Sequence, residues 1–356
     1  MKGSLGYSIK PFSIDTTSEK HINLWYKLRV NYQDEILPEE PFPTKEEIVS
    51  QKILINENQK FSEWTLWNSD NSKIIGNCRI NSYKSNLTST IAGFSIVIQD
   101  SYRKQGLGTA CLKLILDSAI KSGYDLLRTH SNELCREGGL FLLTIGFKNT
   151  GTSHTNQLFL KDLNRNLVKE WLDLPSNPSI NIKIYKCFGR FPEKLIPEIR
   201  NFFQTVYDAE PIKNGVKREK IEFTTENIRK NEELFSKGSK RRIVLFATEA
   251  ITDKLIGMTT ILWAPARPAK VSQYYTAVIP EFRKIGIAKR LKAEMLTIVF
   301  NQLPEAEKIW TGNDDSNEAM LRINNKLGFK PYIKSTSWEI ETDILKKYLS
   351  QKHKTT

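Results

Sequence analysis

Two short basic segments with small residues occupy matching places in the two halves of the chain. The first reads Arg103-Lys104-Gln105-Gly106-Leu107-Gly108-Thr109, and the second, 180 residues later, reads Arg283-Lys284-Ile285-Gly286-Ile287-Ala288-Lys289. Each follows an apolar run and opens a helical pattern. Glycine or alanine lets the main chain approach a ligand closely, and the amides and dipole of a helix start attract anions. The pattern therefore indicates a phosphate-binding turn, to which the arginine and lysine side chains add full charges.

The spacing within these segments excludes two widespread phosphate-binding motifs. Neither copy contains the G-x-x-x-x-G-K-[S/T] pattern of a Walker A loop. The dinucleotide fingerprint G-x-G-x-x-G also fails, because Arg103 or Arg283 stands where its first glycine belongs. A single R-x-x-G-x-[G/A] segment is equally typical of a polar loop before a surface helix. Two copies in the same context favour the phosphate-binding interpretation.

The repeat extends beyond the basic segments. Residues 72–77 resemble residues 253–258, and the Gly-Phe-Lys sequence at 146–148 returns at 328–330. A period of about 180 residues indicates a duplicated domain, since solenoid repeats are far shorter. We therefore predict an N-terminal domain over residues 1–174 and a C-terminal domain over residues 180–356, joined near a proline- and serine-rich stretch.

Each half has the same order of predicted elements, with strands and helices alternating in a mixed α/β pattern. Short β-branched and aromatic runs predict strands, and apolar residues at helical spacing predict helices. The predicted strands cover residues 7–9, 61–67, 74–83, 92–98 and 126–129 in the first half, and 182–185, 243–248, 255–263, 274–279 and 309–311 in the second. The predicted helices cover residues 18–34, 133–144, 193–206, 316–326 and 342–350, besides one after each basic segment.

Composition narrows the class of protein. Of the 356 residues, 39% are hydrophobic and 26% charged, which is typical of a globular protein. The net charge of +13 suits a polyanionic or phosphorylated partner. The four cysteines lack C-x-x-C spacing, which argues against a disulfide framework or a metal site. We find no nucleic-acid-binding module, apolar run of membrane-spanning length or secretory signal, and expect a cytoplasmic protein with neither nucleic acid nor membrane as its partner.

Both halves resemble the GNAT superfamily of acyl-CoA-dependent N-acyltransferases, whose signature [R/Q]-x-x-G-x-[G/A] follows the fourth strand. The second half is the closer match, through residues 276–283, 309–313 and 317–329. Bacterial tandem GNAT proteins, mycothiol-synthase-like ones among them, have a similar layout. The resemblance implies two α/β (mixed α+β) domains, each with a mostly antiparallel central sheet, splayed fourth and fifth strands and flanking helices. It also implies acetyl-CoA as the cofactor.

In that family the main chain of the fourth strand binds the pantetheine arm and polarises the acetyl carbonyl. By position, these main-chain groups belong to Ile96 and Ile98 in the first half, and to Thr276 and Val278 in the second. The amine attacks the thioester directly once its proton has been removed. The other implied cofactor contacts are Arg103, Lys104, Gly106, Leu107, Gly108, Thr109, Arg283, Lys284, Gly286, Ile287, Ala288, Lys289, Asn313 and Asn317.

The sequence departs from the family where many members carry a tyrosine that protonates the departing thiolate. Leu142 and Asn324 stand at that position, four residues before each Gly-Phe pair. Asn324 is therefore a candidate for a hydrogen bond to the cofactor, although a solvent-facing helix position is the alternative. Tyr275 and Glu281 are the candidate catalytic residues besides it. Further candidates for the general base are Tyr274 and Asp314 in the second half, and His130 and His154 in the first.

These observations lead to the expectation of an N-acetyltransferase that acts as a monomer or homodimer. It would move acetyl from acetyl-CoA directly to a primary amine of a small molecule or peptide, with the C-terminal half as the catalytic one. The acidic segments at 37–43 and 208–211 would border the acceptor clefts and suit a cationic amine. The alternative is a non-catalytic acyl-CoA-binding or interaction protein with degenerate sites.

Overall fold

The computed structural model describes residues 6–40, 42–83, 90–175, 181–210, 221–237 and 239–352. These residues form two compact units. Unit 1 takes the described residues up to 152 and those from 335 onward, and unit 2 takes those from 153 to 334. Each unit therefore contains residues from both halves of the sequence. Among the described residues, no helix has the length and apolar character needed to cross a membrane.

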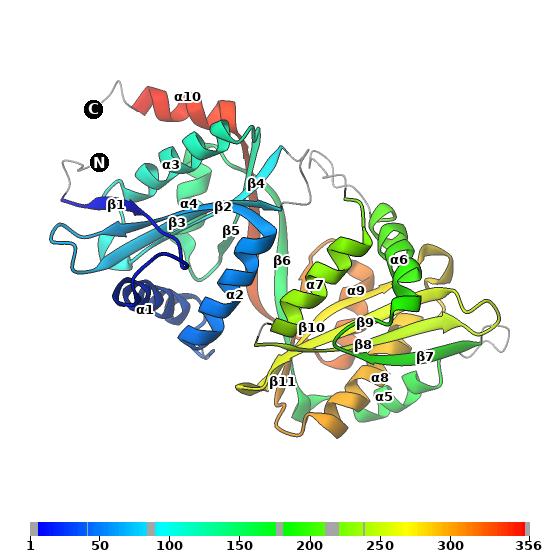
Figure 1. Ribbon diagram of the computed structural model, residues 1–356. Helices are drawn as coiled ribbons and strands as arrows, with labels where there is room; N and C mark the ends of the chain where they lie inside the picture. The colour runs from blue at the N-terminus through cyan, green and yellow to red at the C-terminus, as the bar shows by residue number, and fades with distance from the viewer. Residues whose placement is uncertain are drawn as a thin grey trace. The chain divides into compact units, whose positions relative to one another are not determined.

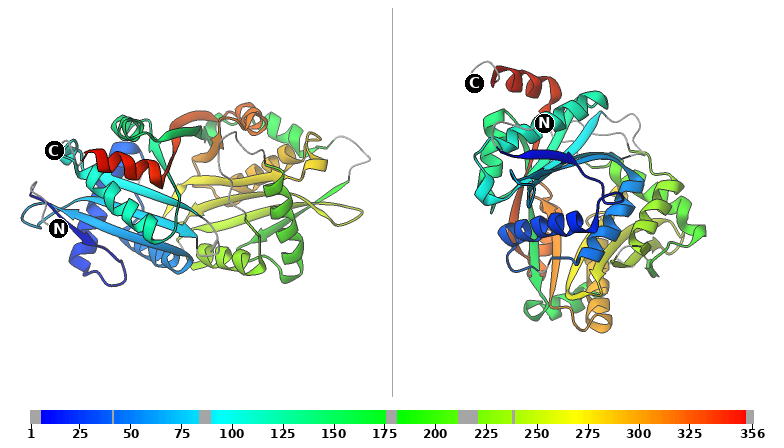
Figure 2. Two further views of the ribbon diagram at one scale, coloured as in Figure 1. Left: turned by 90° about the horizontal axis from the view of Figure 1, so that it is seen from above. Right: turned by 60° about the vertical axis from the view of Figure 1, so that its left-hand side comes forward.

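Unit 1 is a sheet with helices on both faces. Its strands follow the order β1 (Ser8–Pro11), β2 (Gln59–Trp67), β3 (Ile74–Tyr83), β4 (Ile91–Ile98), β5 (Leu126–Asn132) and then the second part of β12 (Lys330–Glu341). Neighbouring strands are antiparallel except β4 and β5. On one face lie α1 (Glu19–Ile36) and α2 (Lys45–Asn58), and on the other α3 (Leu107–Lys121) with α10 (Thr342–Lys352) beside it (Figures 1 and 2). Helix α4 (Arg136–Ile145) packs against β5.

Unit 2 repeats this plan. Its strands follow the order β7 (Ile182–Phe188), β8 (Arg241–Glu249), β9 (Leu255–Ala264), β10 (Arg267–Val278), β11 (Lys308–Asp314) and then the second part of β6 (Lys148–Phe159). Helices α6 (Ile196–Asp208) and α7 (Thr225–Lys237) lie on one face, and α8 (Ile287–Gln302) lies on the other with α5 (Arg165–Leu172) against it (Figure 1). Helix α9 (Glu318–Leu327) follows β11. The two units confirm the predicted mixed α/β architecture.

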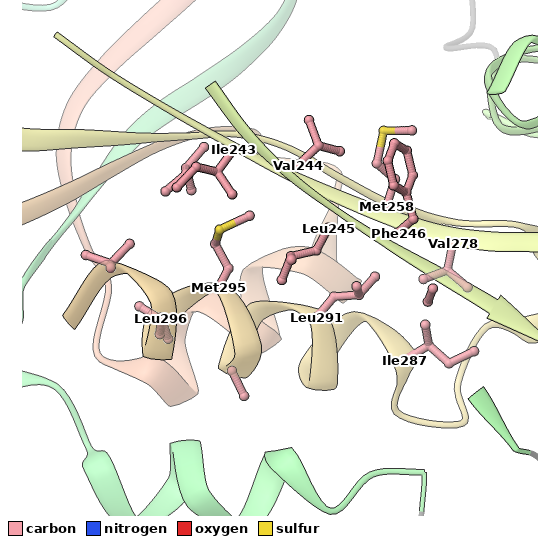
Figure 3. Packing of buried hydrophobic residues seen from close by; sticks show 14 of the residues in the cluster. Ile243, Val244, Leu245, Phe246, Met258, Val278, Ile287, Leu291, Met295 and Leu296 are labelled. Carbon is pink, nitrogen blue, oxygen red and sulfur yellow. The ribbon is translucent and has the colours of Figure 1, made fainter. Parts of the chain in front are cut away.

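The core of unit 2 fixes α8 against the sheet. Successive residues of β8 alternate between the two faces, so that Leu245 lies toward α8 and Phe246 lies on the opposite side (Figure 3). Leu291 and Met295 of α8 are at most 1% exposed. Gly257 permits this close packing, because a Cβ there would lie 3.1 Å from both Ile287 and Leu291. The segment that leads into α8 is therefore held firmly at the end of β10.

The last strand of each half pairs with a strand of the other half. Residues 153–159 of β6 run antiparallel to β11 in unit 2, and residues 335–341 of β12 run antiparallel to β5 in unit 1. The predicted domain boundary between residues 174 and 180 stays a prediction about the repeated sequence. The compact units are divided differently, because each contains residues from both sides of that boundary. A fragment of residues 180–356 lacks the strand beside β11, so tests of function require the whole chain.

Candidate functional site

The fourth and fifth strands of unit 2 separate into a fork. Parallel pairing of β10 with β11 extends only from Lys270 to Ser272, opposite Lys308 to Trp310. On its other side β10 continues to pair with β9, with an irregularity between Gln273 and Tyr275. The main-chain groups that Thr276 and Val278 direct toward the fork are therefore not bonded to β11. Apart from the Val278 carbonyl, which accepts from the Arg283 Nε, such groups are available to bind an extended ligand along the strand.

Unit 1 has the same fork. Pairing of β4 with β5 covers only Ile91 to Gly93, opposite Leu126 to Arg128. Ile96 and Ile98 lie beyond the last pair and are half-buried. Unlike β10, β4 keeps a regular register with its antiparallel neighbour. The splayed strands implied by the family resemblance are thus present in both units, but only unit 2 has the irregularity beside its fork.

Gln273 holds the irregular part of β10 in place. Its side chain is buried, and its Nε2 donates to Thr259 Oγ1 at 2.9 Å and to the Thr260 carbonyl at 3.0 Å. Thr259 Oγ1 also lies 2.8 Å from Thr276 Oγ1. A buried amide is tolerated only when it is hydrogen-bonded, so this network specifies the local backbone shape. Gln273 is not among the site residues predicted from the sequence, where its one signal was an amide directly before the predicted strand at 274–279.

The basic turn of unit 2 forms an uncapped helix start. The Arg283 Nε donates to the Val278 carbonyl at 2.9 Å, which ties the turn to the end of β10. Lys284 and Gly286 adopt positive φ angles of 67° and 102°, and Gly286 is the N-cap of α8. No side chain caps the helix, so its first amides are free to bind an anion. Ile287 is 1% exposed and anchors the helix below them.

The basic turn of unit 1 has the same backbone geometry. The Arg103 Nε donates to the Ile98 carbonyl at 3.1 Å. Lys104 and Gly106 have φ angles of 59° and 81°, and Gly106 is the N-cap of α3, again without a side-chain cap. Leu107 is buried like its counterpart in unit 2. The repeated sequence therefore encodes the same local structure twice.

The electrostatic surroundings of the two turns differ. Arg103 forms ion pairs with Glu35, with Asp100 at 3.3 Å and with Glu137 at 3.8 Å, and Lys104 pairs with Glu137 at 2.7 Å. The hydrogen bond and charge of Lys104 lower the pKa of the Glu137 carboxyl. The cations of unit 1 are thus already matched by carboxylates of the same unit.

In unit 2 the corresponding cations face no such carboxylates. Arg283 and Lys284 are exposed and pair with no carboxylate in the part of the chain that the structure describes. The repeat offsets place Pro280 where unit 1 has Asp100, and Ala319 where it has Glu137. The positive potential at the start of α8 is therefore available to a ligand.

Other predicted cofactor residues of the turns also have packing roles. A Cβ at Gly108 would lie 3.0 Å from the Phe141 ring, so this glycine permits contact between α3 and α4. A Cβ at Gly286 would lie 3.2 Å from Leu174. The Lys289 Nζ lies 5.6 Å from the Trp171 ring centroid, in a cation–π contact. Thr109 and Ala288 are half-buried in the first turns of their helices.

Three asparagines form a buried cluster where β11 meets α9. The Asn324 Nδ2 donates to Asn313 Oδ1 at 2.7 Å, and the Asn156 Nδ2 lies 3.4 Å from the same oxygen. Asn324 is fully buried and its Oδ1 has no hydrogen-bond partner. This excludes the alternative of a solvent-facing helix residue at this position. Asn317 caps α9, because its Oδ1 accepts from the Met320 amide at 3.2 Å.

Strands β6 and β12 each pair with a strand of the other half of the sequence, an arrangement called the strand exchange below. It places His154 in unit 2, although most of the first half of the sequence belongs to unit 1. On β6 His154 pairs in register with Asn313, and its Nδ1 lies 2.6 Å from Asp315 Oδ1. The expectation that His154 serves the first half is wrong, because β6 pairs with β11 in unit 2. His130 remains in unit 1, exposed, with its Nδ1 3.1 Å from Ser337 Oγ of β12.

The tyrosines of β10 lie toward α6 and α7. The Tyr275 ring contacts Phe203 of α6, and Tyr274, which is 60% exposed, contacts Phe235 of α7. Burial, and secondly the charge of Glu210, raise the pKa of the Tyr275 phenol well above its ordinary value. Tyr275 therefore stays protonated near neutral pH and is suited to donating a hydrogen bond, not to acting as a base. Glu281 is exposed on the turn after β10.

The acidic segments expected at the acceptor clefts are only partly described, since Pro41 and Pro211 lie outside the described residues. Glu210 is exposed and close enough to Tyr275 to influence its pKa, and Asp208 accepts from Gln204 at 3.0 Å. Glu40 is buried, at 4% exposure. The second segment therefore contributes negative charge on the α6 face of unit 2.

Comparison with known proteins defines the class. The model of the acetyltransferase (GNAT) family matches residues 23–134 and 203–329, which together exceed half of the chain. The chain therefore belongs to the GNAT acetyltransferase family, with one matched region in each half. Among curated protein sequences there is no significant match.

Solved structures share the two-unit fold. A tandem GNAT protein from the clavulanic acid biosynthesis pathway matches with a TM-score of 0.75 at 17% identity, covering 94% of this chain and 98% of that one. A GCN5-related N-acetyltransferase from Sphaerobacter thermophilus matches with a TM-score of 0.66 at 11% identity, covering 96% and 97%. At such low identity, these similarities establish the fold alone.

Proposed function

We propose that unit 2 transfers an acetyl group from acetyl-CoA to a primary amine of a small molecule or peptide. The observation that carries this proposal is the uncapped start of α8 beside an open fork, with Arg283 and Lys284 unmatched by any carboxylate of the described residues. Such a turn suits the pyrophosphate of CoA, and the free edge of β10 suits its pantetheine arm. The buried and unpartnered Asn324 Oδ1 fits a hydrogen-bond donor of that arm.

The residues of unit 2 supply positioning and electrostatic stabilisation. The main-chain groups of Thr276 and the amide of Val278 hold the thioester in the fork, and amides near the irregularity of β10 stabilise negative charge on the acetyl oxygen. The amine enters from the α6 and α7 face, where Glu210 favours a cation and Tyr275 donates a hydrogen bond. The amine attacks the acetyl carbon, the carbon–sulfur bond breaks, and the proton lost by nitrogen balances the one gained by the thiolate.

Thiol release from acetyl-CoA by the whole chain tests this function. A panel of polyamines, amino acids, amino sugars and short peptides is supplied in turn, and the acetylated amine is identified by mass. We expect release of CoA to match acetylated product with at least one class of amine. Acetyl-CoA binding without release across the panel would support the alternative of a non-catalytic acyl-CoA-binding protein.

A carboxylate introduced at Ala319 tests the electrostatic difference between the turns. Ala319→Glu places a carboxylate near Arg283 and Lys284, at the position that corresponds to Glu137 in unit 1. We therefore expect the Kd for acetyl-CoA to rise about tenfold, a loss of about 1.4 kcal/mol in binding free energy. Ala319→Gln is the neutral control and is expected to change Kd by less than about threefold. Calorimetric titration measures both. Equal weakening by glutamate and glutamine would show that bulk, not charge, matters there.

Replacing Gln273 by leucine tests its role as a positioning residue. Without the bonds to Thr259 and Thr260, the irregular part of β10 loses its support, and we expect kcat to fall about tenfold with little change in KM for acetyl-CoA. Steady-state thiol-release kinetics give both constants. Gln157→Leu on β6 is the control, since it removes only the acceptor of the Trp310 Nε1. An unchanged kcat in Gln273→Leu would rule out the positioning role.

A further inference from the structure

Unit 1 carries a buried cluster of charged side chains on its α1 and α2 face. Lys52 of α2 and Glu63 of β2 are 7% and 4% exposed and form an ion pair. The Asn77 Nδ2 donates to Glu63 Oε1 at 2.9 Å. Glu63, the one carboxylate of this cluster among the described side chains, is therefore already matched by an ammonium and an amide.

Two guanidinium groups adjoin this ion pair. Arg79 of β3 is the register partner of Glu63 and is exposed, so its side chain lies on the same face of the sheet. Arg29 lies on α1 one turn after Trp25 and is half-buried. Neither arginine forms an ion pair or a side-chain hydrogen bond within the described ranges. Helix α1, which carries Arg29, packs against β3, which carries Arg79. Burial, and secondly the charge of Arg79, lower the pKa of Arg29.

The walls of this cluster combine hydrogen-bond donors with aromatic rings. The Lys52 Nζ lies 4.3 Å from the Trp25 ring centroid and 5.3 Å from that of Phe12. The Arg29 guanidinium carbon lies 6.0 Å from the Tyr32 centroid. Trp25 is 3% exposed, and its Nε1 donor has no partner. Buried donors without acceptors are rare, because each such group costs about 1–3 kcal/mol.

We propose that this cluster is a binding site for a small organic carboxylate. Among the described side chains, three cations face one carboxylate, and the surplus positive charge and unused donors call for an anion. Guanidinium groups bind carboxylates through two parallel hydrogen bonds, and exposed Arg79 gives access from solvent. The aromatic walls favour an anion with a carbon skeleton over inorganic phosphate. The site belongs to unit 1, and its proposal does not depend on the acetyl transfer proposed for unit 2.

Calorimetric titration of the whole chain with sodium benzoate, succinate, L-glutamate and inorganic phosphate, at constant ionic strength, tests this site. We expect at least one carboxylate to bind with a stoichiometry of one per chain, and phosphate to bind at least about tenfold more weakly. Arg29→Gln and Arg79→Gln should each raise the Kd of that carboxylate about tenfold or more. Lys27→Gln, which removes an exposed cation elsewhere on α1, should leave the Kd unchanged.

Three outcomes would overturn the proposal. They are no binding of any carboxylate up to about 10 mM, tighter binding of phosphate than of every carboxylate, or unchanged affinity in both arginine variants. Thermal melting of each variant verifies that it is folded. If Arg29→Gln fails to fold, the test uses Arg79→Gln, at an exposed position, and Arg29→Lys, which keeps the charge. Arg29→Lys should bind the carboxylate more weakly than the parent protein, because lysine cannot form the two parallel hydrogen bonds of a guanidinium group.

Discussion

A Gly286→Val variant is expected to lose about 100-fold or more in kcat/KM for acetyl-CoA, equivalent to about 2.7 kcal/mol. Gly286 has a φ of 102°, which a β-branched residue adopts only at high energy. A Cβ there would also lie 3.2 Å from Leu174. The variant must therefore shift the turn, and the first amides of α8 no longer converge on one anion. Steady-state kinetics with acetyl-CoA as the varied substrate measure the loss.

The matched control is Gly106→Val in unit 1, where φ is 81°. It imposes comparable backbone strain of about 1–2 kcal/mol at the start of α3. We expect it to lower thermal stability similarly while leaving kcat/KM within about threefold, since the catalytic turn is in unit 2. If Gly106→Val removed activity and Gly286→Val preserved it, the assignment of the catalytic unit would be reversed.

A Lys292→Met variant is expected to raise the free energy of unfolding by about 3 kcal/mol at pH 6. Lys292 lies on α8, is 2% exposed and is 5.8 Å from the Phe329 ring centroid. Burial lowers its pKa from 10.5 to about 7. Below pH 7 Lys292 is charged in both the folded and the unfolded protein, so the folded protein bears the full cost of a buried ammonium. Between pH 7 and 10.5 the unfolded chain binds more protons, so stability rises with pH.

The gain from Lys292→Met should therefore shrink with pH, to about 1 kcal/mol or less at pH 10. A full shift from 10.5 to about 7 sets an upper limit of about 5 kcal/mol, which relaxation around the ammonium reduces. Chemical denaturation at pH 6, 8 and 10 measures the trend. Lys121→Met, at an exposed position of α3, is the control and should show no such trend. A constant gain would contradict a buried charge.

Local features were largely predictable from the sequence. Strand β3 begins at Ile74 and ends at Tyr83, as predicted. The prediction rested on the β-branched and aromatic residues of this segment and on the turn that precedes Ile74. Both basic turns have the expected form, because glycine at the N-cap supports a positive φ and the following apolar stripe fixes the helix. The family resemblance supplied the splayed strands, which no local pattern could reveal.

Some helices are not predicted because they are short, contain few apolar residues or lack apolar residues at helical spacing. Helix α7 (Thr225–Lys237) is rich in charged residues, and its apolar contacts rest on a few positions such as Ile228 and Phe235. Helices α2 and α5 were likewise not predicted. Propensity alone does not reveal a helix whose stability comes from packing against a sheet.

The strand exchange and the matched charges of unit 1 depend on tertiary contacts. Strands β6 and β12 each follow a Gly-Phe pair, and nothing in either strand indicates which sheet it joins. Glu137 lies far along the chain from Glu35, yet both pair with Arg103. Sequence comparison identified two similar turns, whereas only the structure reveals that one of them is already neutralised.

Calorimetric titration of the whole chain with acetyl-CoA tests the central claim most directly. We expect one molecule bound per chain, with binding retained in Gly106→Val and lost in Gly286→Val. Two molecules per chain, or a single site that Gly106→Val removes and Gly286→Val leaves intact, would contradict the assignment of the acetyl-CoA site to unit 2.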